Sequence, residues 1–152
     1  NILVSSCLLG AACRYDGKSC PQQILQTASK EYHFIPICPE QLGGLSTPRP
    51  PAEYKNGQVW NKNGENVTAQ YKYGAERALE IAKKYNCKYA ILKEKSPSCG
   101  YGKIYDGSFR GVVIEGNGIT ATCLQAYGIK IIGESEAVSF LQSLQKQENK
   151  QK

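Results

Sequence analysis

Seven cysteines in 152 residues are the side chains of this sequence best suited to specific chemistry. Thiolates bind soft ions, chiefly zinc, copper(I) and the iron of iron–sulfur clusters, and they also act as nucleophiles. Secreted disulfide-rich domains favour an even number of cysteines, so disulfides are not the expected use here. Cys7 and Cys13 are separated by five residues, unlike the Cys-x-x-Cys pair of zinc fingers and thioredoxin-like sites. Their position in the fold must therefore decide which cysteines meet.

Alternating patterns of strand and helix predict a single α/β domain. Short apolar runs indicate strands over residues 2–6, 33–38, 88–92 and 129–132. Helices are expected over residues 21–32, from Thr68 onward, over 119–127 and over 134–145. This alternation predicts a three-layer, Rossmann-like open sheet of about four mainly parallel strands with helices on both faces. We assign residues 1–145 to this domain and residues 146–152 to a frayed C-terminal tail.

The segments between these elements are long enough to be functional. Residues 40–66 are rich in proline and glycine, and residues 93–118 are irregular apart from a small hairpin around Ile104 and residues 112–113. Long loops inside a compact domain usually carry function. We therefore expect the site to be built from these loops.

The carboxyl ends of parallel strands are where such sheets bind ligands. Five cysteines belong to that end or can reach it: Cys7, Cys13, Cys20, Cys38 and Cys99. Cys87 starts a strand at the opposite end and Cys123 lies inside a helix, so both are expected to be small buried side chains. Placement alone favours a soft-metal site, with a thiol nucleophile or sulfur carrier, or purely structural cysteines, as alternatives.

Polar residues near the same end are candidates for catalysis and substrate binding. Glu40 follows the second predicted strand and is either a general base or a solvated or helix-capping carboxylate. Ser96 and Ser98 lie in the segment SPSCGYG, where they either contact substrate or stabilise a turn. Arg49 could pair with a carboxylate, contact substrate or fix the proline-rich loop. Asn117 precedes a helix whose first N–H groups could face a polar substrate.

Composition places the chain among globular proteins, with 41% hydrophobic and 21% charged residues. No apolar run approaches the roughly 20 residues of a membrane helix, so no membrane partner is expected. The N-terminus reads as a strand without a basic leader, which predicts a cytoplasmic protein. The net charge of +6 is dispersed, without a basic stripe interleaved with aromatics, which disfavours a nucleic-acid partner.

Four segments together resemble the thiouracil desulfidase family, bacterial proteins long catalogued as a domain of unknown function. The segments are SSCLLGAACRYDGKS, PICPEQLGGLSTPRPPAE, LKEKSPSCGYGKIYDGSF and GNGITATCL, in this order and at these separations. The resemblance extends from Ile2 to about Glu136. Because four separate motifs occur in one chain, it is highly specific.

The resemblance implies an iron–sulfur enzyme that removes sulfur from a small thiolated pyrimidine, either thiouracil or a related base or nucleoside. A 4Fe-4S cluster in this family is held by three cysteines, which match Cys7, Cys13 and Cys99. Its fourth iron is open and accepts the sulfur of the substrate. The family's catalytic glutamate and serine match Glu40 and Ser96. The implied reaction is a non-redox hydrolysis that replaces C=S by C=O.

Cys20 and Cys38 are additional thiols near the expected site. Cys20 does not match a ligand of the family, and as a fourth ligand it would close the open iron. The alternatives to a desulfidase are a cysteine persulfide sulfur carrier and a zinc- or thiol-binding protein.

Overall fold

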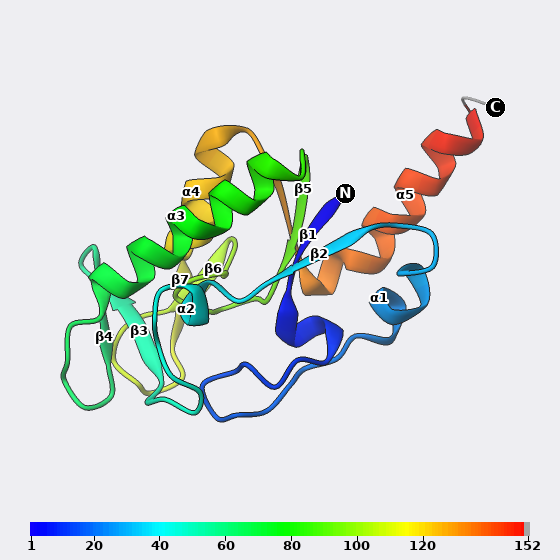
Figure 1. Cartoon of the computed structure of the whole chain (residues 1–152). Coiled ribbons are helices and arrows are strands. Elements are labelled where there is room, and N and C mark those ends of the chain that lie inside the picture. Colours follow the sequence, from blue (N-terminus) through cyan, green and yellow to red (C-terminus); the bar gives the residue numbers. More distant parts are fainter. Residues whose placement is uncertain (151–152) are drawn as a thin grey trace.

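A four-stranded parallel sheet in the order β2–β1–β5–β8 forms the centre of the computed structural model, which describes residues 1–150 (Figure 1). Its strands are β1 (Ile2–Ser5), β2 (Phe34–Ile37), β5 (Tyr89–Leu92) and β8 (Lys130–Gly133). Every residue of β1 is buried, as expected for a central strand of a sheet covered on both faces. The predicted α/β class and the four parallel strands are confirmed.

Helices cover both faces of this sheet, with α1 and α5 on one side and α3 and α4 on the other (Figure 1). The helices are α1 (Gln23–Ala28), α2 (Pro39–Leu42), α3 (Thr68–Lys84), α4 (Ile119–Tyr127) and α5 (Ala137–Lys150), with 3-10 turns η1 (Ser6–Leu9) and η2 (Glu134–Glu136). Successive side chains of a strand point to opposite faces. Ile2 and Val4 therefore pack with α1 and α5, whereas Leu3 packs with α3 and α4.

Two antiparallel hairpins extend from the sheet in the segments predicted to be irregular. They pair β3 (Ala52–Lys55) with β4 (Gln58–Asn61), and β6 (Lys103–Tyr105) with β7 (Val113–Glu115). The second hairpin confirms the one predicted around Ile104. The first was predicted as loop, although its turn residues Asn56 and Gly57 both have positive φ, the Asn-Gly signature of a tight hairpin.

The ends of two helices differ from the predicted ends. Helix α1 stops at Ala28, four residues before the predicted end at Tyr32. Helix α5 continues to Lys150, so residues 146–150 of the predicted tail are helical, and residues 151–152 lie outside the described residues. Within residues 1–150, no helix is long and apolar enough to cross a membrane.

The chain segments that leave β1 and that lead into β5 run to opposite sides of β1. The chain leaves β1 through α1 to β2 on one side, and it reaches β5 on the other side of β1 through α3. Such a divergence opens a crevice at the carboxyl ends of the two strands. The loops that follow β1 and β5 carry the cysteine motifs.

Candidate active site

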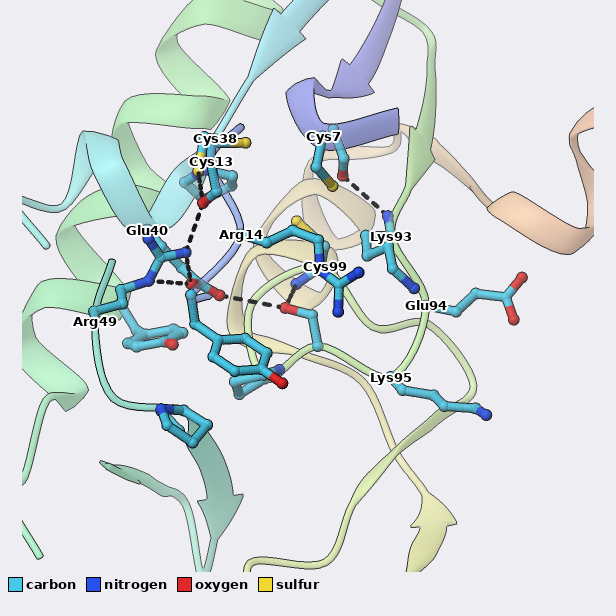
Figure 2. A pocket seen from close by; sticks show the side chains of 18 of the residues that line it. Cys7, Cys13, Arg14, Cys38, Glu40, Arg49, Lys93, Glu94, Lys95 and Cys99 are labelled. Carbon is cyan, nitrogen blue, oxygen red and sulfur yellow. Dashed lines mark hydrogen bonds and ion pairs between the residues drawn. The ribbon is translucent and has the colours of Figure 1, made fainter. Parts of the chain in front are cut away.

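A cavity of about 450 Å³ lies at the carboxyl ends of the central strands and is lined by residues from both long irregular segments. Four cysteines line it: Cys7, Cys13, Cys38 and Cys99. Figure 2 shows these four side chains around one part of the pocket, with Glu40 and Arg49 next to them. The structure therefore brings together four of the five cysteines that were predicted to meet.

Each thiol is placed by the backbone that follows a strand. Cys7 lies in η1 directly after β1, and the Cys7 carbonyl oxygen accepts the N–H of Cys20 at 2.9 Å, which folds the loop back. Cys13 lies within that loop. Cys38 immediately follows β2, and Cys99 lies in the turn of residues 96–100 that follows β5. Three adjacent strands thus deliver their thiols to one end of the sheet.

Burial and mutual contact raise the pKa of three of these thiols. Burial is the main cause that raises the pKa of Cys99 to about 12. Contact with Cys13, followed by burial, raises the pKa of Cys38. The contact with Cys38 lowers the pKa of Cys13, but contact with Cys7, burial and the charge of Cys7 together raise it by more. Cys13, Cys38 and Cys99 therefore ionise less easily than exposed cysteines do.

The remaining cysteines lie outside the lining of the pocket. Cys20 is half-buried, and its Sγ atom lies 3.9 Å from Nε2 of Gln22. Cys87 is buried at the opposite end of the sheet, as predicted. Cys123 was predicted to be buried but is only partly buried, although its thiol contacts the carbonyl oxygen of Ala75 at the interface of α3 and α4.

Glu40 is held by an ion pair with Arg49. Nε of Arg49 donates to Oε2 of Glu40 at 2.8 Å, Nη2 contacts the same oxygen, and the two side chains are 6% and 14% exposed. Nη2 also donates to the carbonyl oxygen of Cys13 at 3.0 Å. Of the roles considered for Arg49, the structure shows carboxylate pairing together with attachment to two loops. Because Arg49 engages Oε2, the other carboxylate oxygen of Glu40, Oε1, faces Ser96.

Ser96 connects Glu40 to the turn that carries Cys99. Its Oγ atom accepts the N–H groups of Ser98 and Cys99 at 3.0 and 3.1 Å. The same hydroxyl donates to Oε1 of Glu40 over a long 3.5 Å contact. Tyr71 closes this corner, and its burial and the negative charge of Glu40 raise its pKa. A hydroxyl and a carboxylate are therefore adjacent beside the thiols.

Two predicted substrate-binding residues do not face the cavity. The Ser98 side chain is buried, and its Oγ atom forms a 2.7 Å hydrogen bond with Oγ1 of Thr120 in α4. Oδ1 of Asn117 accepts the N–H of Gly102 at 2.7 Å. The first N–H groups of α4 are also engaged, because Ile119 and Thr120 donate to the carbonyls of Pro97 and Ser98. The helix start therefore stabilises the Cys99 turn instead of facing the pocket.

Basic residues missed by the sequence analysis also line the pocket: Arg14, Lys93 and Lys95. Figure 2 shows the Arg14 side chain reaching toward Cys99, with Lys93 nearby. Nζ of Lys93 lies 2.5 Å from Oε1 of Glu134. The two lysines directly follow β5, so the same strand-end rule that selected the cysteines could have found them. Arg14 thus adds a positive charge to the lining of the cavity, whereas the charge of Lys93 is paired with Glu134.

The donor set of the cavity fits a soft metal centre. Four free thiols converge there, and thiolates select zinc, copper(I) and iron–sulfur clusters over hard ions. The charge of the neighbouring Arg49 guanidinium lowers the pKa of Cys13, which favours its thiolate form. Among residues 1–150, no three or more His, Cys, Asp and Glu side chains already have the spacing of a metal site.

Comparison with known proteins agrees with the resemblance found in the sequence. The model of a family described as 2-thiouracil desulfurase matches residues 2–136. The uncharacterized protein YbbK of Bacillus subtilis strain 168 is 43% identical in an alignment of 150 residues that covers 92% of this chain and 99% of YbbK. A solved structure described as a 4Fe-4S-dependent thiouracil desulfidase, TudS, is 41% identical with a TM-score of 0.89, covering 95% of this chain and 97% of that one.

Proposed function

Because the chain belongs to the 2-thiouracil desulfurase family, we propose that it is an iron–sulfur desulfidase that converts a thiolated pyrimidine to its oxo form. The observation that carries this proposal is the convergence of three cysteines with a carboxylate and a hydroxyl in one cavity: Cys7, Cys13, Cys99, Glu40 and Ser96. The described 4Fe-4S dependence of TudS supports the choice of cofactor. The substrate class is thiouracil or a related base or nucleoside.

Cys7, Cys13 and Cys99 are the residues that would hold the cluster. They come from the loops after β1 and β5, which flank the crevice, and they leave Cys38 as a fourth thiol of the same cavity. A cluster with three protein ligands supplies a soft Lewis acid that can receive sulfur. The protein must provide everything else, namely orientation, a base and a proton path.

The reaction adds water and releases sulfide, so that one C=S bond becomes C=O without net electron transfer. Water is a weak nucleophile and needs a general base within hydrogen-bond reach. Glu40 is the base in this proposal, because it is the carboxylate that lies beside the thiols, and Arg49 fixes its orientation. The proton that Glu40 takes from water is then available to the departing sulfur or the ring nitrogen.

Ser96 has the proposed role of positioning and proton relay. Its hydroxyl oxygen already accepts two backbone N–H groups, so its proton points outward toward Glu40. This arrangement keeps the single hydroxyl proton of Ser96 directed at Oε1 of Glu40. A small shift of the 3.5 Å contact would connect the two groups into a chain.

Anaerobic reconstitution tests the cofactor and the activity together. We expect about four iron atoms per chain and release of sulfide from 2- or 4-thiouracil. Serine variants of Cys7, Cys13 and Cys99 should each lose iron and activity. Cys38→Ser and Cys123→Ser, the matched controls, should keep both. Iron-free activity with a persulfide on one cysteine would instead identify a sulfur carrier.

Variants of Glu40 and Ser96 separate catalysis from binding. Glu40→Gln and Ser96→Ala should retain iron but lower the rate of sulfide release by about 10²-fold or more, the usual contribution of general acid–base groups. Unchanged rates in both variants would contradict the assigned roles. The iron content of each variant provides the control for damage to the metal site.

A further inference from the structure

One wall of the cavity is formed by the loop between β6 and β7, residues 106–112. Phe109 in this loop lines the cavity, as does Tyr105 at the end of β6. Phe109 has φ +59°, in the left-handed region that non-glycine residues rarely adopt. Such conformations persist only where the surroundings enforce them, and they concentrate at functional sites.

Glu53 on β3 enforces this conformation. Its Oε1 atom accepts the N–H of Gly107 at 3.0 Å and the N–H of Phe109 at 3.1 Å. The residue is only 9% exposed, and the mechanism proposed above does not use its carboxylate. Because one oxygen accepts both backbone N–H groups, it fixes the backbone of the loop and with it the direction of the Phe109 side chain. Glu53 thus joins the first hairpin to the loop of the second.

Gly107 allows the loop to lie directly on β3. A Cβ atom at this position would lie 2.6 Å from Cβ of Lys55, and Gly107 itself has φ +93°. Any side chain here would push the loop outward. The sequence therefore provides two independent devices, a carboxylate and a glycine, that bring Phe109 to the cavity.

We propose that Phe109 is the aromatic wall against which the flat pyrimidine ring of the substrate lies, with Glu53 as the residue that positions it. This inference rests on the proposed function. An aromatic face binds every planar base in the same manner, and a phenyl ring does so without competing for the polar groups of the ring. The thiols, Glu40 and Ser96 then act on the edge of the substrate, where the sulfur is.

Binding of two reaction-inert ligands tests the wall. Uracil is planar, whereas 5,6-dihydrouracil has the same hydrogen-bonding edge on a puckered ring. Reconstituted wild-type protein, titrated by calorimetry, should bind uracil about tenfold more tightly than dihydrouracil, the size expected for one stacking contact. Phe109→Ala should weaken uracil binding about tenfold and remove the preference, while Phe109→Tyr retains it.

Variants that leave Phe109 intact test its positioning. Glu53→Ala and Gly107→Ala should both reduce the preference for uracil, whereas Glu53→Gln, which keeps an acceptor oxygen, should restore most of it. Val112→Ala is the matched control, because Val112 is exposed in the same loop and does not line the cavity. A role of Phe109 in stability alone would lower the melting temperature without changing the ligand preference.

Kinetics with thiouracil provide the second readout. An aromatic wall contacts the substrate and the transition state to the same extent. Its loss in Phe109→Ala should therefore raise KM for thiouracil and leave kcat within about twofold. An unchanged uracil preference and an unchanged KM in Phe109→Ala would overturn the inference while leaving the desulfidase proposal intact. Wild-type protein that binds uracil selectively but releases no sulfide would overturn the proposed function and retain the wall.

Discussion

Arg49 is the residue on which the geometry of Glu40 depends most. Its guanidinium contacts the carboxylate with two nitrogens and the carbonyl oxygen of Cys13 with one of them. Only 6% of its side chain is exposed. A single side chain therefore couples the proposed base to the loop that carries a proposed cluster ligand.

Arg49→Ala should lower both stability and activity. Removing one partner of a buried ion pair leaves an uncompensated charge, and the free energy of unfolding should fall by about 3 kcal/mol. Arg49→Lys keeps the charge but not the planar fork, so an intermediate loss is expected. Urea unfolding and sulfide release measure the two effects.

Arg77→Ala is the matched control for this loss. Arg77 pairs with Glu80, but the two side chains are 41% and 58% exposed, so the change in unfolding free energy should be below about 1 kcal/mol. Equal losses for the two arginine variants would contradict the structural role of Arg49. A double variant with Glu40→Gln should recover part of the loss, since no unpaired charge remains.

At the level of elements, α2 carries Glu40 and lies in backbone contact with α3. Gly74 makes this approach possible, because a Cβ atom there would lie 1.9 Å from the carbonyl oxygen of Pro39. Gly43 faces the same contact from the other helix, where a Cβ atom would lie 2.0 Å from the carbonyl oxygen of Gln70. The distance between the helices therefore sets the position of Glu40.

Gly74→Ala should move α2 away from α3 and displace Glu40. In an unobstructed helix interior, replacing Gly by Ala raises the free energy of unfolding by about 1 kcal/mol. Here the clash with Pro39 should instead lower the free energy of unfolding by about 2 kcal/mol. Thermal unfolding measures stability, and sulfide release should fall while iron content is retained. Glu76→Ala on the exposed face of α3 is the control, and a stabilising effect of Gly74→Ala would refute the contact.

Glu94 connects the end of β5 to η2. Oε1 of Glu94 accepts the N–H of Ser135 at 2.5 Å. Burial raises the pKa of Glu94, but the Ser135 hydrogen bonds and the charge of Lys93 lower it by more, below its usual 4.5. The ionised carboxylate is therefore the form that the folded state prefers.

This preference predicts the pH dependence of a variant. A lowered pKa contributes stability that is present above pH 4.5 and is lost as the pH falls through the folded-state pKa. Glu94→Gln should destabilise at pH 7 by under about 1 kcal/mol, given solvent screening. The difference from wild type should shrink below pH 4.5, as measured by urea unfolding. Glu115→Gln, at an exposed position of β7, should show no such dependence.

At the level of the whole molecule, the parts that follow from local sequence could be predicted. The parallel sheet follows from short apolar runs between helical segments, and the strand-end rule brought Cys7, Cys13, Cys38 and Cys99 to one cavity. The family resemblance, confirmed by the match over residues 2–136, selected three of these four.

The parts that depend on contacts between distant segments could not be predicted. The direction of the Ser98 side chain depends on Thr120, 22 residues away, which turns it from the cavity into the α4 interface. The hydrogen bond that the N–H of Phe109 donates to Glu53 spans 56 residues and joins the two hairpins. The hairpin that carries Glu53 was not predicted. No local pattern encodes such pairings, because both partners are ordinary residues of their own segments.

The two apolar clusters on the faces of the sheet should keep the protein folded when iron is removed. They contain the central residues of β1 and β5. The proposed ligands Cys7, Cys13 and Cys99 also belong to them, but from the loops that follow the strands. Small zinc domains behave differently, since they unfold without their metal. Chelation should therefore lower the melting temperature by several degrees, about the effect of 1–2 kcal/mol in a domain of this size, and unfolding should remain cooperative.

Hydrogen exchange should localise this change. In the iron-free protein, amides of residues 6–20 and 93–100 should exchange faster, while those of β1, β5 and β8 should keep their protection. Cys7→Ser protein should show the iron-free pattern before chelation and respond little to the chelator. Loss of protection throughout the sheet would instead mean that the metal centre is part of the folding core. Faster exchange confined to the two loops would mean that stability and chemistry reside in different parts of the molecule. The sheet would provide the stability, and the loops at its carboxyl end would bind and react.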